Sequence, residues 1–166
     1  MTTAADLSIP RRRVGSRLLI DHAVSIIGHM VNTKYLNASA ALVLAYVAIT
    51  AVTVLALALL SLIAPDLATS HAWGHAIIVV GFAVLLPLRS RAARKGKRGA
   101  LRAVALISIT LVAVNIVEGV LPGAFPTWMR VEMFGVAALM AANAALVVRV
   151  AVAEQVSAST ATAASD

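Results

Sequence analysis

The chain has 166 residues, of which 61% are hydrophobic and 13% are charged. This composition lies far outside that of soluble domains and excludes a soluble enzyme or binding domain. The net charge is +7, but 12 of the 14 basic residues fall in the first 34 residues and in residues 89–102. Such clustering is typical of membrane topology and anionic lipid contact, so no nucleic acid partner is expected. The lack of cysteine excludes disulfides and thiolate metal sites.

The N-terminal region is predicted to form a basic tail followed by an amphipathic helix. Residues 1–15 contain three consecutive arginines, and no apolar run follows closely enough to form a secretory signal. In residues 16–36, polar and apolar side chains separate onto two faces at helical spacing. We expect this helix to lie in the membrane plane; the alternative is that its apolar face packs against a soluble domain or against the spans. Four arginines are expected to contact lipid phosphates: Arg11, Arg12, Arg13 and Arg17.

Four apolar runs follow and predict four membrane-spanning helices, at about residues 38–64, 71–88, 103–121 and 128–148. Asn37 or Ser39 is the predicted cap of the first of these helices. Pro87 is expected to loosen the last turn of the second. Residues 151–166 are predicted to form a polar tail that is largely disordered. The sequence therefore predicts an all-α integral membrane four-helix bundle over residues 37–150.

The charges of the loops predict the orientation of the bundle. The loops at residues 65–70 and 121–128 hold no basic residue. The central loop holds seven, which are expected to contact lipid phosphates and to fix the topology: Arg89, Arg91, Arg94, Lys95, Lys97, Arg98 and Arg102. Because basic loops stay on the cytoplasmic side, the N-terminus, the central loop and the C-terminus are predicted to be cytoplasmic.

Glu118 is the most costly polar residue in the predicted spans. A carboxylate inside a span is strongly unfavourable unless it is paired, hydrated or protonated, which makes Glu118 a candidate functional group. His75 is predicted to lie at a similar depth, Arg130 is a second possible partner, and Glu132 lies at the rim. The sequence favours a structural cluster of ion pairs or hydrogen bonds here. The alternative is a site that handles protons or substrate.

His71 and His75 lie one helical turn apart and, with the nearby carboxylates, offer the donor types of a zinc site. This pair is a weak motif, because the chain lacks the HExxH pattern of zinc peptidases. No metal and no cofactor are therefore predicted.

Other polar and small residues are predicted to serve contacts between helices. Asn143 and Ser108 lie at similar distances from the cytoplasmic ends of their spans, so a hydrogen bond between them is expected. Asn115 lies nearer the opposite end and is not expected to pair with Asn143. Gly135, Ala138 and Ala142 form a stripe of small residues that would permit close approach of another helix, within the bundle or from a partner subunit.

The run LPGAFPTWMRVE, residues 121–132, resembles a turn shared by a group of small four-span membrane proteins of high-GC Gram-positive bacteria. Those proteins have an LPGxFPxW turn that leads into a helix beginning near an acidic residue. The matching positions here are Leu121, Pro122, Gly123, Phe125, Pro126, Trp128 and Glu132. The resemblance covers the C-terminal part of the chain. It implies a four-span protein of the bacterial cell membrane and assigns no catalytic residue.

The sequence favours a non-catalytic accessory or scaffolding subunit, because it offers interaction surfaces but no nucleophile constellation, phosphate loop or redox ligands. The alternative is an oligomeric small transporter or channel component that uses Glu118 and His75 as a titratable pair. A membrane enzyme acting on lipid would need more convergent polar residues at one interface. The expected partners are anionic lipid headgroups and either further copies of the chain or a larger membrane protein complex.

Overall fold

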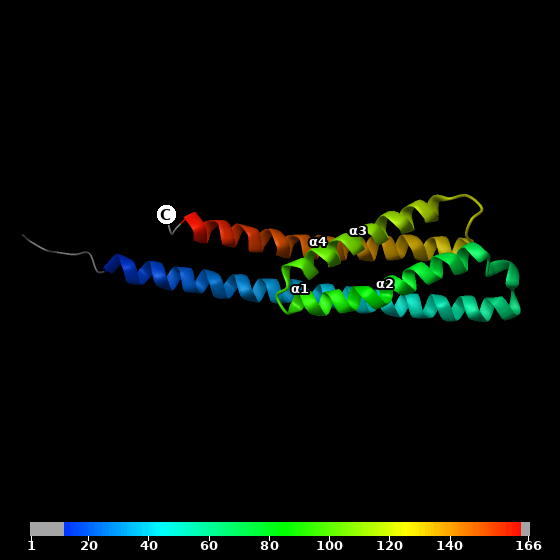
Figure 1. Ribbon diagram of the computed structural model, residues 1–166, viewed down its shortest axis with the longest axis horizontal. Helices are drawn as coiled ribbons and strands as arrows, with labels where there is room; N and C mark the ends of the chain where they lie inside the picture. Colours follow the sequence, from blue (N-terminus) through cyan, green and yellow to red (C-terminus); the bar gives the residue numbers. More distant parts are fainter. Residues whose placement is uncertain (1–11, 164–166) are drawn as a thin grey trace, which may run out of the picture. The chain divides into compact units, whose positions relative to one another are not determined.

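The structure is a computed structural model that describes residues 12–163 and, of these, the side chains from Asn32 to Val156 and of Ser159. It consists of helices and one short 3-10 turn (Figure 1), in the order α1 (Arg12–Ile63), η1 (Pro65–Leu67), α2 (Ser70–Arg94), α3 (Arg98–Val120) and α4 (Thr127–Ala163). No strand occurs between residues 12 and 163. The predicted all-α four-helix bundle is confirmed.

Within the described residues, four helical segments are long and apolar enough to cross a membrane: Asn32–Ile63, Ser70–Arg94, Arg98–Val120 and Thr127–Val156. The shortest, α3, has 23 residues and at 1.5 Å per residue reaches about 35 Å, more than a hydrocarbon core of about 30 Å. Large apolar side chains such as Leu62 and Ile77 point outward, as contact with lipid requires. The chain is therefore a multi-pass membrane protein.

The helix that contains the first span, α1, does not begin at the predicted cap. The chain divides into two units between Thr33 and Lys34, but no helix boundary occurs at Asn37 or Ser39, since α1 includes both. Neither Gly nor Pro occurs between residues 29 and 63, so nothing local ends the helix there. Ser39 is instead buried and donates a hydrogen bond to another helix.

The predicted position of the N-terminal helix in the membrane plane stays a prediction. Arg11 lies outside the described residues, as do the side chains of Arg12, Arg13 and Arg17. The contacts described below all lie within residues 34–163.

Both helices that flank the predicted central loop are longer than expected. Helix α2 continues past Pro87 to Arg94, and α3 already begins at Arg98. The loop is thereby reduced to the turn Lys95–Lys97. Gly96 takes a left-handed conformation there, with φ of 78°. The amides of Gly96 and Lys97 bond back to the carbonyls of Ala93 and Ala92, the two bonds that close a Schellman motif.

Helix α4 extends to Ala163 rather than ending at Arg149. After Gly135 the sequence contains neither Gly nor Pro, and alanine, the strongest helix former, recurs throughout. Most of the segment predicted as a disordered tail is therefore helical within the described residues. Residues 164–166 lie outside them.

The side chains of α1 to α4 within residues 34–163 form two buried clusters. The larger contains Tyr46, Leu86, Leu111 and Met140. Tyr46 is fully buried and donates its hydroxyl to the carbonyl of Val79 at 2.9 Å, which joins α1 to α2. The smaller cluster lies near the turn at residues 121–126 and comprises Leu57, Ala72, Ala76, Met129 and Met133, with Phe125 and Trp128 packed against it. The residues described next lie beside these clusters.

Candidate intramembrane polar site

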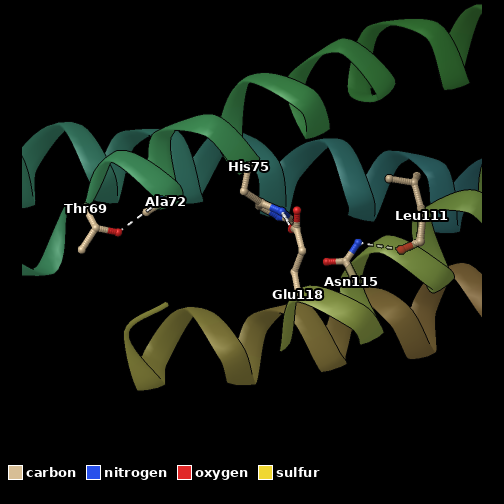
Figure 2. A network of polar contacts seen from close by, with 6 residues as sticks. All are labelled: Thr69, Ala72, His75, Leu111, Asn115 and Glu118. Carbon is tan, nitrogen blue, oxygen red and sulfur yellow. Dashed lines mark hydrogen bonds and ion pairs between the residues drawn. The ribbon is translucent and has the colours of Figure 1, made fainter. Parts of the chain in front are cut away.

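The side chains of Glu118 of α3 and His75 of α2 contact each other inside the bundle, as a hydrogen bond or, when His75 is protonated, as an ion pair. Figure 2 shows the two side chains pointing toward one another from neighbouring helices, with His75 Nδ1 against Glu118 Oε2. His75 is buried, and the Glu118 side chain is 23% exposed. The predicted pairing of Glu118 with His75 is confirmed.

The hairpin of α2 and α3 places these two residues opposite each other. His75 precedes Gly96 by 21 residues and Glu118 follows it by 22, so two antiparallel helices that diverge from this turn bring both residues to the same level. The start of α2 is fixed by Thr69, whose hydroxyl oxygen accepts from the amide of Ala72 (Figure 2). His75 lies in the second turn of that capped helix.

A second carboxylate, Glu132 of α4, lies near this pair and accepts a hydrogen bond from Thr53 of α1. The same hydroxyl lies 3.0 Å from the carbonyl of Ile49 in its own helix, so its single proton is shared between the two acceptors. Threonine hydroxyls in helices commonly bond the backbone four residues earlier. For that reason the additional bond between α1 and α4 could not be predicted from the residue type alone. Glu132 itself is partly buried, and Thr53 is buried.

Arg130 does not pair with Glu118, contrary to one of the two predicted partnerships. Its Nε donates to the carbonyl of Gly119 at 2.8 Å. This carbonyl belongs to the last turn of α3, where four carbonyls have no partner within the helix. Arg130 of α4 therefore caps the C-terminal end of α3, and Glu118 contacts His75 instead.

A small cavity lies among the four helices beside the pair, with room for about one water molecule. His75 and Glu132 line it together with Tyr46, Thr53 and Asn115. An imidazole and a carboxylate thus face the same enclosed space, and Glu118 contacts this space only through His75. An imidazole held by one carboxylate and close to a second is suited to accept, hold and pass on a proton.

His71 is exposed and does not join the polar cluster. Its ring meets Phe125 edge-on, with ring centroids 6.5 Å apart, and the His75 ring meets the same Phe125 at 6.0 Å. One aromatic side chain of the turn at residues 121–126 thus lies against both histidine rings. Within the described residues, no three His, Asp or Glu side chains are placed to hold a metal ion together.

The predicted contact between Ser108 and Asn143 is confirmed, with Asn143 Nδ2 donating to Ser108 Oγ at 2.9 Å. Asn143 Oδ1 also accepts from Ser39 at 2.7 Å, so one amide joins α1, α3 and α4. Asn115 bonds only the carbonyl of Leu111 in its own helix (Figure 2).

In the structure, Gly135 does not lie between two helices of the bundle. It and Ala138 lie on the exposed side of α4, and a methyl group added at Gly135 would meet no atom within 4 Å. The expected contact of this stripe with another helix of the bundle is therefore not found at Gly135 and Ala138.

The seven basic residues predicted to face lipid headgroups are all exposed. They are distributed over the end of α2, the turn and the start of α3, at the ends of these helices remote from Glu118.

No protein-family model, no curated protein and no solved structure matches this chain.

Proposed function

We propose that this protein is a non-catalytic accessory or scaffolding subunit of the membrane. The observation that carries the proposal is that polar side chains within the spans bond to neighbouring helices. His75 joins α2 to α3, Thr53 joins α1 to α4, and Asn143 joins three helices. In a bilayer such bonds stabilise helix association. The polar residues of the spans are thus used to hold one arrangement of helices, which suits a protein that presents its outer surface to others.

The outer surface that we assign to a partner is the face of α4 that carries Gly135 and Ala138. Both residues are exposed, and small side chains permit close approach of a second helix. The resemblance of residues 121–132 to a group of small four-span proteins supports the bacterial cell membrane as the location. The charge distribution supports cytoplasmic termini.

Site-specific photocrosslinking in cells tests this proposal. A photoreactive residue at Ala138 is expected to give one discrete crosslinked product, either a dimer or a complex of fixed mass. The same residue at Leu44, which is 69% exposed on α1, serves as the control and is expected to give none. If both positions give only the monomer, and the purified protein is monomeric in detergent, the accessory role is rejected.

A second candidate function is proton-coupled transport by an oligomer, and the ion pair of His75 with Glu118 beside Glu132 is the observation that favours it. Ionisable groups inside a span commonly mark proton relays. The cavity holds about one water molecule, so a wider pathway would have to form between copies of the chain.

Substitution of Glu118→Gln separates the two functions. Glutamine keeps a hydrogen bond to His75 but cannot carry the charge. Proton flux into liposomes that contain the purified protein is expected to fall at least tenfold if transport is the function. The accessory role instead predicts no flux above that of protein-free liposomes for either form, and unchanged crosslinking from Ala138. Arg130→Gln, which leaves the ion pair intact, is the control for both measurements.

A further inference from the structure

A larger cavity of about 170 Å³ lies between α3 and α4 at the ends remote from the His75–Glu118 pair. It is lined by Arg98, Leu101 and Arg102 of α3 and by Ala151, Glu154 and Gln155 of α4. Leu101 packs in the large core cluster, which fixes the register of this part of α3. The cavity exists because α4 continues past Arg149 and brings Glu154 beside the first turns of α3.

The charges around this cavity have both signs and are not paired with each other. Within the part of the chain that the structure describes, no ion pair joins Glu154 to Arg98 or to Arg102. Both arginines are exposed, and Glu154 is partly buried. The open space is thus surrounded by two guanidinium groups and one carboxylate that do not neutralise each other. Such a site is suited to a ligand that carries one negative and one positive group.

The position of the cavity indicates the ligand. It lies at the ends of the two spans beside the basic turn, the level at which phospholipid headgroups meet a membrane protein. Leu106 of α3 and Val148 of α4 follow one helical turn further into the membrane and are 66% and 44% exposed. Their side chains provide an apolar surface for acyl chains below the charged groups.

We propose that this cavity binds the headgroup of a zwitterionic aminophospholipid such as phosphatidylethanolamine. The phosphate contacts Arg98 and Arg102, because guanidinium groups match phosphate oxygens in pairs. The ammonium contacts Glu154. Phosphatidylglycerol also satisfies the arginines with its phosphate, but its neutral glycerol leaves the Glu154 carboxylate without a cation to contact. Glu154 is therefore the residue that selects the lipid.

Native mass spectrometry of the purified full chain, with equal amounts of phosphatidylethanolamine and phosphatidylglycerol of matched acyl chains, tests the assignment. Wild-type protein is expected to retain more phosphatidylethanolamine. Glu154→Gln should lower the ratio of the two bound lipids about two- to fivefold, the range of one solvent-exposed ion pair. Glu154→Asp keeps the carboxylate and should keep the preference.

Two further variants distinguish lipid binding in the cavity from general attraction of lipid to the basic residues around the α2–α3 turn. Arg102→Gln should weaken retention of both lipids. Lys95→Gln removes the same charge from the exposed turn outside the cavity and should change neither. Unfolding followed by the fluorescence of Trp73 and Trp128 shows whether each variant is folded.

The proposal is overturned if folded Glu154→Gln keeps the wild-type ratio, or if Lys95→Gln weakens retention as much as Arg102→Gln. Displacement of the bound lipid by millimolar inorganic phosphate would also overturn it, because the site would then recognise phosphate alone.

Discussion

Asn143 shows how much of the bundle depends on one side chain. Its amide accepts from Ser39 of α1 and donates to Ser108 of α3, and the residue itself belongs to α4. It is fully buried. Asn115 is buried to the same degree, but its amide bonds only Leu111 of its own helix. The two asparagines therefore differ in whether their bonds cross between helices.

We expect Asn143→Ala to lower the free energy of unfolding by about 1–2 kcal/mol more than Asn115→Ala, because it removes two bonds between helices. Both substitutions leave a cavity of similar size, so the difference reports the bonds. Titration with SDS in mixed micelles, followed by circular dichroism, measures it. Equal losses for the two variants would show that the bonds through Asn143 contribute nothing beyond packing.

At the scale of single elements, the turns decide where the helices meet. Gly96 and Gly123 both have positive φ, at 78° and 73°. Gly96 lets α2 and α3 reverse within a three-residue turn and so sets His75 opposite Glu118. Gly123 lies in the turn before α4, where the ring of Phe125 contacts the rings of His71 and His75 edge-on.

Gly123→Ala is expected to destabilise the protein by about 1 kcal/mol, because an L-residue is strained in the left-handed region. No atom lies within 4 Å of the added methyl group, so steric contact makes no contribution. Gly74→Ala is the control, since this glycine lies within α2 and also has open space around it. Alanine favours helix there, and its effect should be neutral or stabilising by about 0.5–1 kcal/mol. Melting temperatures in detergent that fall equally for both variants would contradict this account.

At the scale of the whole molecule, the basic residues and the carboxylate–histidine pair lie at opposite ends of α2 and α3. All seven basic residues from Arg89 to Arg102 are exposed. The membrane potential and anionic lipids favour keeping such a cluster on the cytoplasmic side. The Glu118 end carries no comparable cluster, so the charge asymmetry along this hairpin predicts one orientation of the protein.

Replacement of these seven basic residues by glutamine is expected to produce molecules in both orientations. The chain has no cysteine, so Asp66→Cys and Gln155→Cys report the two ends separately through labelling by a membrane-impermeant maleimide in intact cells. With the native loop, only Asp66→Cys should react. Arg130→Gln removes one charge from the other end and should leave the labelling unchanged. If the neutralised loop keeps the wild-type pattern, the basic residues do not determine topology and have a different role.

The sequence alone determined the class of this protein. Runs of apolar residues long enough to cross a bilayer require helices, because every backbone amide in the membrane needs a partner within its own segment. The same reasoning placed His75 level with Glu118 and Ser108 level with Asn143, since depth in a span follows directly from counting residues. These predictions depend on helical rise and membrane thickness, both of which are independent of packing.

Tertiary structure decided which residues face one another at a given depth. Arg130 and His75 were both predicted to lie near the depth of Glu118. The rotation of each helix about its own axis decides the contacts: His75 lies against Glu118, and Arg130 lies against the carbonyl of Gly119. Thr53 gained Glu132 in the same way. The continuation of α4 created the cavity beside Glu154. Sequence periodicity defines the faces of each helix, but packing of all four together fixes which faces meet.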